Sequence, residues 1–211
     1  MSGPPGPPEP SEETASVPAS PNPPLRLVRG TASIEDLDEF LATLDAVADE
    51  TGAVVQAFDA DLVVSERHLS EATRLAARSI ARGEAVARDP GVEVLLYAAG
   101  TRQIDRALEL GVSEGERRTV VLVADFGEVP GAERAVADLD AAVDALTETL
   151  HSVGGEAMPA HGSVSDDDSV WNHDPNRVRE FYGVTDRELA ATAGDLTDVV
   201  RERAALLDVE K

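Results

Sequence analysis

The stretch LRLVRGTASIEDLDEFLATLDAVADETGAVVQAF, residues 25–58, carries the signals of a strand, a helix and a second strand in succession. Residues 25–32 alternate apolar and polar side chains, which is typical of a strand. Ser33 and Asp36 have the spacing of a capping box, and this spacing predicts a helix to about Glu50 that ends at Thr51-Gly52. Residues 53–58 then read as a second strand. The order indicates a fold that combines helices with a sheet.

The rest of the chain continues the alternation of short apolar runs and amphipathic stretches. Further strands are predicted at 92–98 and 119–124, and helices at 65–83, 101–110, 132–150, from the Thr185/Glu188 capping box, and from 195 to 208. We expect a single α+β domain in which a mixed sheet of about four strands packs with about six helices. The long segments between strands leave parallel pairing open.

Two segments differ in composition from this domain. Residues 1–24 hold nine of the thirteen prolines and no lysine or arginine. We expect them to form a disordered Pro-rich tail, with the domain spanning 25–211. Residues 151–175 are rich in Gly, Ser and Asp and predict a flexible acidic loop.

Acidic residues dominate the charge of the chain: 41 Asp and Glu against 18 Lys and Arg give −23, and Lys211 is the only lysine. We interpret this surface as an adaptation to a saline cytoplasm, where dense carboxylates keep a protein hydrated. An acidic protein that repels nucleic acid is the alternative in dilute buffer. The chain has no cysteine and no apolar run as long as a membrane span. We therefore expect a cytoplasmic protein with no membrane partner.

Catalytic motifs are missing from the sequence. It has no phosphate-binding glycine loop, no Gly-x-Ser-x-Gly elbow and no zincin helix, so we expect no cofactor and no enzymatic activity. His151, His161 and His173, together with Asp166–Asp168, supply atoms that a metal could use. Their spacing is irregular, which favours a solvated loop. A metal-dependent enzyme that uses this loop remains an alternative.

Arginines gather in the segment 64–118, which contains nine arginines and nine acids, so the remaining chain carries the whole net charge. On a helix, Arg67, Arg74, Arg78 and Arg82 share one arc of about 80°, opposite to apolar residues. Such a stripe is either a solvated face that pairs with acids such as Glu71 or a surface that binds anions.

A second candidate site follows the apolar run 94–99, where the chain passes through Gly100 toward a helix. Unpaired backbone N–H groups at a helix N-terminus attract anions. Tyr97 could stack on a base, and Arg102 and Gln103 could bond to phosphate or base edges. The alternative is that Tyr97 is only a core aromatic residue.

Several motifs together resemble one known family. They are Phe58-Asp59-Ala60, His68-Leu69, the run 95–104 (LLYAAGTRQI), and the terminal Arg201-x-Arg203-Ala204-Ala205-Leu206-Leu207-Asp208. The chain resembles the PRPK-binding (TPRKB-like) small subunits of the KEOPS tRNA-modification complex, here of a haloarchaeal type.

The resemblance implies a subunit without an active site that binds the complex's kinase-like ATPase subunit. It also implies delivery of tRNA, recognised at its 3′ CCA end, to the threonylcarbamoyl transferase subunit, which makes threonylcarbamoyladenosine. A self-associating structural domain is the remaining alternative.

The predicted site residues form two groups. The RNA-binding group is Arg67, His68, Arg74, Arg78, Tyr97, Arg102, Gln103 and Ile104, and the partner-binding group on the terminal helix is Val199, Val200, Arg203, Ala204, Leu206 and Leu207. No metal site and no catalytic residue are predicted. For the terminal helix, packing within the domain is the competing explanation.

Overall fold

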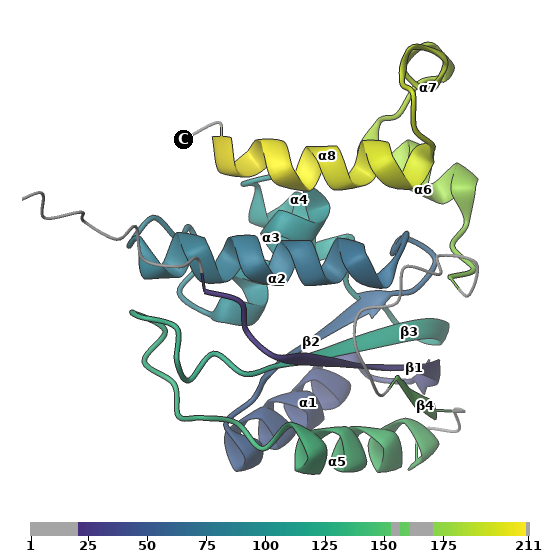
Figure 1. Cartoon of the computed structure of the whole chain (residues 1–211). Coiled ribbons are helices and arrows are strands. Elements are labelled where there is room, and N and C mark those ends of the chain that lie inside the picture. The colour runs from purple at the N-terminus through teal and green to yellow at the C-terminus, as the bar shows by residue number, and fades with distance from the viewer. Residues whose placement is uncertain (1–20, 153–156, 161–170, 210–211) are drawn as a thin grey trace, which may run out of the picture.

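The sheet at the centre of the fold has the strand order β2-β3-β1-β4, and each of its three pairings is antiparallel. The computed structural model describes residues 21–152, 157–160 and 171–209. The strands are β1 (Leu25–Ile34), β2 (Val54–Asp59), β3 (Gly115–Ala124) and β4 (Ala157–Ala160). Helices cover both faces of this sheet (Figure 1).

The central strand β3 is buried on both of its faces. Its register places Ala124 opposite both Leu25 of β1 and Val54 of β2. Val120 and Leu122 contact the core on one side of the sheet, whereas the alternating Val121 and Val123 contact the core on the other. This two-sided burial explains why residues 119–124 form a nearly continuous apolar run.

One face of the sheet is covered by α1 (Leu37–Thr51) and α5 (Leu139–Ser152). Phe40 and Leu44 of α1 and Leu146 and Leu150 of α5 fill the core between these helices and the sheet. The opposite face is covered by α2 (Glu66–Ala81) and α3 (Pro90–Ala99), followed by the short α4 (Ile104–Leu108).

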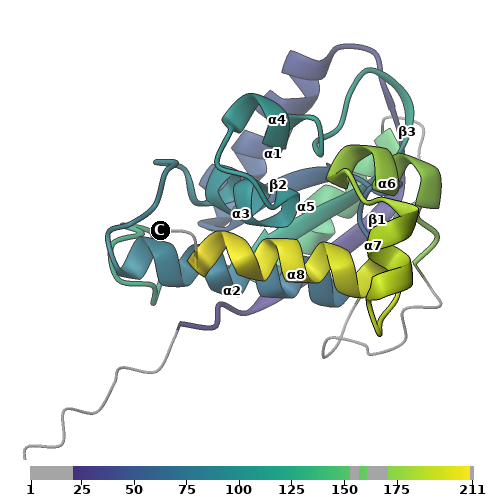
Figure 2. The ribbon, with the colours of Figure 1, turned by 90° about the horizontal axis from the view of Figure 1, so that it is seen from above.

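The C-terminal helices form an additional layer outside α2 and α3. They are α6 (Pro175–Tyr182), α7 (Asp186–Ala191) and α8 (Leu196–Val209). Seen from above, α8 lies along α2 and α3 (Figure 2). A separate core cluster, which includes Val64, Tyr182 and Val200, joins this layer to the segment between β2 and α2.

Gly100 permits the close approach of α8. Its φ of 62° is a conformation that glycine adopts without strain, and a Cβ built there would lie 3.1 Å from the Cβ of Arg203. The turn after α3 therefore holds the middle of α8 directly against the body of the domain.

The α+β class and the single domain are confirmed, and several predicted helix ends are confirmed as well. Ser65 accepts a hydrogen bond from the His68 N–H, Thr185 accepts one from Glu188, and Gly52 ends α1 with φ 73°. The parallel pairing that the sequence left open is not found among the described strands. Asp36 alone caps α1, because β1 continues through Ser33 to Ile34.

The predicted strand at 92–98 is wrong, because these residues belong to α3. The Asp89 side chain accepts hydrogen bonds from the Gly91 and Val92 N–H groups, Pro90 occupies the first turn, and Gly100 ends the helix. Nine of the ten residues of α3 are buried. A helix that is apolar on every side has no helical period, so its sequence looks like a buried strand.

The predicted start of the helix at 132 is also wrong, since α5 begins at Leu139. The preceding segment is a loop held by Asp125, whose carboxylate accepts hydrogen bonds from the Gly127 and Ala137 N–H groups. Asp138 then caps α5 through the Ala141 N–H.

The segment predicted as the acidic loop, 151–175, contains β4, which pairs with residues 27–30 of β1. Residues 153–156 and 161–170 of that segment lie outside the described residues, as do residues 1–20 of the predicted tail.

Candidate functional site

The arginine stripe of α2 is partly neutralised by carboxylates from two helices. Glu71 on α2 binds Arg201 of α8 at 2.8 Å and Arg67 at 3.5 Å. Burial raises the pKa of Glu71, but the hydrogen bonds and charge of Arg201, with Arg67, lower it overall. Arg78 pairs with Asp208 in the last turn of α8. The explanation in which these arginines pair with acids thus holds for Arg67 and Arg78.

Arg74 and Arg82 differ from these two. Arg74 is half-buried and Arg82 is exposed, and neither forms an ion pair with another described residue. Both lie close enough to Arg78 that, after burial, their charges lower the pKa of that guanidinium. Of the predicted stripe, Arg74 and Arg82 are thus the cations open to a new anion.

His68 and Tyr97 lie in the interior, where neither can reach RNA in this conformation. His68 is fully buried, and its Nε2 donates to the Ala98 carbonyl at 2.9 Å, an oxygen that also accepts from the Tyr182 hydroxyl. Tyr97 is 2% exposed, and its hydroxyl faces Asp208 at 3.4 Å. Tyr97 is thus a core aromatic residue, which was the alternative in the sequence analysis. Its buried ring is not accessible for base stacking.

The turn between α3 and α4 exposes a different set of side chains. Gln103 and Ile104 are exposed, whereas Arg102 is half-buried and donates to the Leu207 carbonyl at 2.9 Å. Leu108, one turn after Ile104, is 54% exposed, and sequence reasoning missed it. An aliphatic pair on one face of a short helix offers an apolar surface to a ligand or partner.

The terminal helix α8 divides into a buried and an exposed face. Val199, Val200, Ala204 and Leu207 are buried against the domain. Packing within the domain thus accounts for four of the six predicted partner residues, and Arg203 binds Glu188 of α7 at 2.9 Å.

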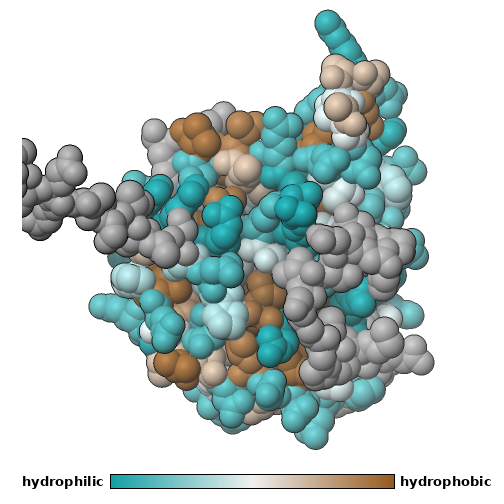
Figure 3. Space-filling view, viewed as in Figure 1, coloured by the Kyte–Doolittle hydropathy of each residue, from teal (hydrophilic) through white to brown (hydrophobic). Residues whose placement is uncertain are grey.

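The exposed face of α8 ends in aliphatic residues. Ala205 is exposed, Leu206 is 47% exposed, and Val209, which sequence reasoning missed, is 75% exposed. Hydrophobic surface gathers at the end of the molecule where α8 terminates (Figure 3). We call Ala205, Leu206 and Val209 the α8 apolar edge.

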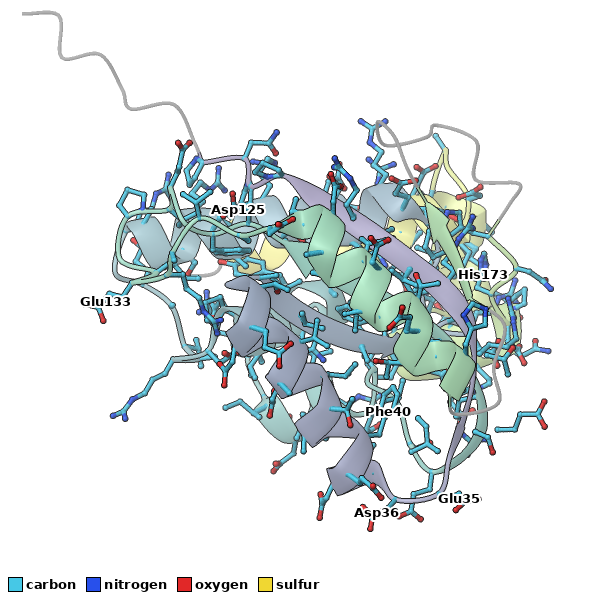
Figure 4. The ribbon with its side chains drawn as sticks, turned by 90° about the horizontal axis from the view of Figure 1, so that it is seen from below. Glu35, Asp36, Phe40, Asp125, Glu133 and His173 are labelled. Atoms are coloured by element: carbon cyan, nitrogen blue, oxygen red, sulfur yellow. The ribbon has the colours of Figure 1, made fainter. Side chains whose placement is uncertain are left out.

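The opposite side of the molecule, formed by α1 and α5, is acidic. The helices α1 and α5 contain eight Asp and Glu residues (38, 39, 45, 49, 50, 140, 144 and 148) and no lysine or arginine. Their carboxylates, with Glu35 and Asp36 at the start of α1, cover the underside of the molecule (Figure 4). The acidic side chains of this face repel a polyanion.

A network of charges that the sequence did not reveal fixes α6. Arg177 binds Asp59 at 2.7 Å and Asp61 at 2.9 Å, and Arg118 binds Asp61 at 2.6 Å. The hydrogen bond to Asp59 is the main cause of the raised pKa of Arg177. A cleft of about 200 Å³ between α4 and α6 is lined by Arg177 and Arg106, but Arg106 also pairs with Glu109. The cleft therefore offers neither guanidinium free to an anion.

The candidate metal loop is only partly described. His151 is exposed at the end of α5 and His173 is half-buried, whereas His161 and Asp166–Asp168 lie outside the described residues. Within the described part of the chain, no group of three or more His, Asp or Glu side chains could hold a metal ion. No described helix is long and apolar enough to cross a membrane.

The burial of His68 predicts a loss of stability in mild acid. Burial, opposed by the Ala98 hydrogen bond and by Glu71, lowers the pKa of His68 from 6.5 to about 4. Between these two pKa values the unfolded chain binds a proton that the folded chain excludes. The contribution of neutral His68 to the free energy of unfolding is therefore complete above pH 6.5 and is lost as the pH falls toward 4. We expect roughly 3 kcal/mol less stability at pH 4 than at pH 7 from this group.

Urea unfolding between pH 7 and pH 4.5 measures this effect. Because the other acids titrate too, the informative quantity is the difference between the wild type and His68→Gln, in which the amide can still donate to Ala98. The exposed His151→Gln is the control and should follow the wild type. Equal pH slopes for the wild type and His68→Gln would show that His68 does not titrate in this way.

The structure thus sets a partly paired, charged helical face and exposed aliphatic side chains on an antiparallel α+β core. Residues 34–208 match the model of the family described as kinase binding protein CGI-121, and the chain belongs to this family. No curated protein matches the chain. The family assignment confirms the resemblance to PRPK-binding (TPRKB-like) proteins and gives a kinase as the class of partner.

Proposed function

We propose that this chain is the non-catalytic small subunit of a KEOPS complex in the cytoplasm of a salt-adapted archaeal cell. In this role it docks the kinase-like ATPase subunit, and through it the threonylcarbamoyl transferase subunit, and recruits tRNA for threonylcarbamoyladenosine modification. The observation that supports the proposal most is the family match over residues 34–208. The −23 charge with a single lysine supports the saline setting.

The kinase-like subunit docks on the α8 apolar edge in this proposal. The buried face of α8 already holds the helix in place, so docking needs no ordering of a loose segment. Leu206 and Val209 are large, exposed and close together on the last turns, so they offer apolar area that docking would bury. Of the predicted partner residues, the proposal keeps the exposed Leu206, and it adds Val209.

The tRNA contacts in this proposal use exposed or half-buried groups on the same side of the molecule. Arg74 and Arg82 supply charge, and Gln103 and Ile104 supply polar and apolar contacts to the unstacked bases of a CCA end. Guanidinium planes stack on bases, so arginine can replace the aromatic ring that Tyr97 does not present.

Affinity capture from the native cytosol in molar KCl tests the proposed function. A tagged copy of the full chain should retain the kinase-like ATPase subunit, the transferase subunit and tRNA, identified by mass spectrometry and RNA sequencing. Adding ribonuclease should remove the tRNA and leave the kinase-like subunit bound, because the α8 apolar edge contains none of the proposed tRNA-binding residues. Recovery of neither KEOPS subunit would contradict the proposal.

A further inference from the structure

The last turn of α8 lies between two groups of the candidate RNA-binding residues. Arg78 of α2 donates to Oδ2 of Asp208, and the Tyr97 hydroxyl faces Oδ1 of the same carboxylate at 3.4 Å. On the other side, Nη2 of Arg102 donates to the Leu207 carbonyl at 2.9 Å. Two consecutive residues of α8 thus occupy two of the arginines that the sequence assigned to RNA.

The carboxylate of Asp208 is unfavourably placed for the helix that carries it. A helix C-terminus bears a partial negative charge, and the last turn of α8 contains no basic residue of its own. The Asp208 side chain is nevertheless only 7% exposed, and the Arg78 side chain is 24% exposed. The carboxylate is therefore stabilised by a cation from outside α8, Arg78.

A guanidinium binds carboxylate and phosphate in the same geometry. Arg78 lies between Arg74 and Arg82 on one face of α2, at intervals of four residues, and the charges of both neighbours act on it. Displacing Asp208 would therefore turn two available guanidinium groups into a row of three, and breaking the contact to the Leu207 carbonyl would release Arg102 as a fourth.

We propose that the last turn of α8 is a latch that covers Arg78 and Arg102, and that RNA phosphates open it by replacing the Asp208 carboxylate and the Leu207 carbonyl. This inference rests on the proposed tRNA binding and describes its regulation. The closed latch keeps the row of arginines from attracting other polyanions, and only a ligand that supplies phosphates to several of these arginines together displaces it.

Asp208→Asn tests the latch, because asparagine keeps the shape of the side chain and removes the charge that competes with phosphate. The probe is a fluorescein-labelled single-stranded RNA of 20 nucleotides ending in CCA, titrated by anisotropy with the full chain across a KCl series. We expect the variant to bind about fivefold more tightly than the wild type, as one added charged contact provides. The slope of log affinity against log salt should steepen by about 0.7 for each phosphate gained.

Two further variants separate the latch from general effects. Asp186→Asn makes the same charge change at a side chain that is 92% exposed and paired only with Arg179, so it should bind as the wild type does. Asp208→Asn combined with Arg78→Gln should return to wild-type affinity, because the released guanidinium is then missing. An equal gain in Asp186→Asn would overturn the latch.

Hydrogen exchange provides a measurement on the wild type, independent of whether Asp208→Asn folds. Saturating RNA should speed exchange of the backbone amides in the last turn of α8, and unchanged or slower exchange there would overturn the latch. If Asp208→Asn and the wild type bind RNA with equal affinity and slope, the latch is wrong and the proposed tRNA binding stands. If neither binds RNA at any salt concentration, both proposals fail.

Discussion

Replacing Tyr97 by alanine should destabilise the protein by about 3 to 5 kcal/mol, the range measured when a large aromatic side chain is removed from a core. The ring is among the largest fully buried groups and lies in the cluster between the sheet and helices α2 and α3. Chemical unfolding in KCl measures the effect. Because most domains have a total stability of only about 5 to 15 kcal/mol, this single change should bring the chain close to unfolding.

Tyr97→Phe is the matched control. It keeps the ring and loses only the long hydroxyl contact to Asp208, so stability should fall by about 1 kcal/mol or less. RNA binding of this variant should not weaken. A folded Tyr97→Ala variant with wild-type stability, or a Tyr97→Phe variant that loses RNA, would show that Tyr97 acts on the surface.

The sequence predicted best where local chemistry decides structure. Ser65, Thr185 and Gly52 all lie at the helix ends that their side chains or backbone freedom favour. The run 119–124 was also read correctly as a strand, since its short length and β-branched residues favour a buried strand. These signals come from residues within about four positions of one another. They can therefore be read from the sequence without knowledge of the tertiary contacts.

The prediction failed where burial depends on distant parts of the chain. The apolar run of α3 is buried by the sheet, α2 and α8, so its pattern could not separate helix from strand. Two local signals in the sequence do indicate a helix here: Asp89 and Pro90 are typical of a helix start, and Gly100 is typical of a helix end.

For the candidate site residues, the sequence did not indicate which side chains are already paired or buried within the domain. Arg67, Arg74 and Arg78 do lie on one helix, yet the partners of Arg78 and Arg102 come from residues more than 100 positions away. No periodicity predicts such long-range pairing. In α8 the buried and exposed faces both carry aliphatic side chains, so the sequence pattern could not show which face packs against the domain.

Leu206→Asp should remove binding of the kinase-like subunit while leaving the domain folded. The side chain is 47% exposed, so a carboxylate there can remain hydrated in the free chain. In a complex it would be buried among apolar groups without a partner, a cost that at an interface anchor weakens affinity about 30-fold or more. Leu41→Asp is the matched control, because Leu41 is 39% exposed but lies on α1, across the sheet from α8.

The most direct test of kinase docking on the α8 apolar edge is the dissociation constant of the full chain and the purified kinase-like subunit, measured by calorimetry in molar KCl. Unfolding curves of each variant should first confirm that it is folded. The account predicts that Leu206→Asp loses affinity about 30-fold or more while Leu41→Asp binds as the wild type does. Wild-type affinity in a folded Leu206→Asp variant, or an equal loss in Leu41→Asp, would contradict it.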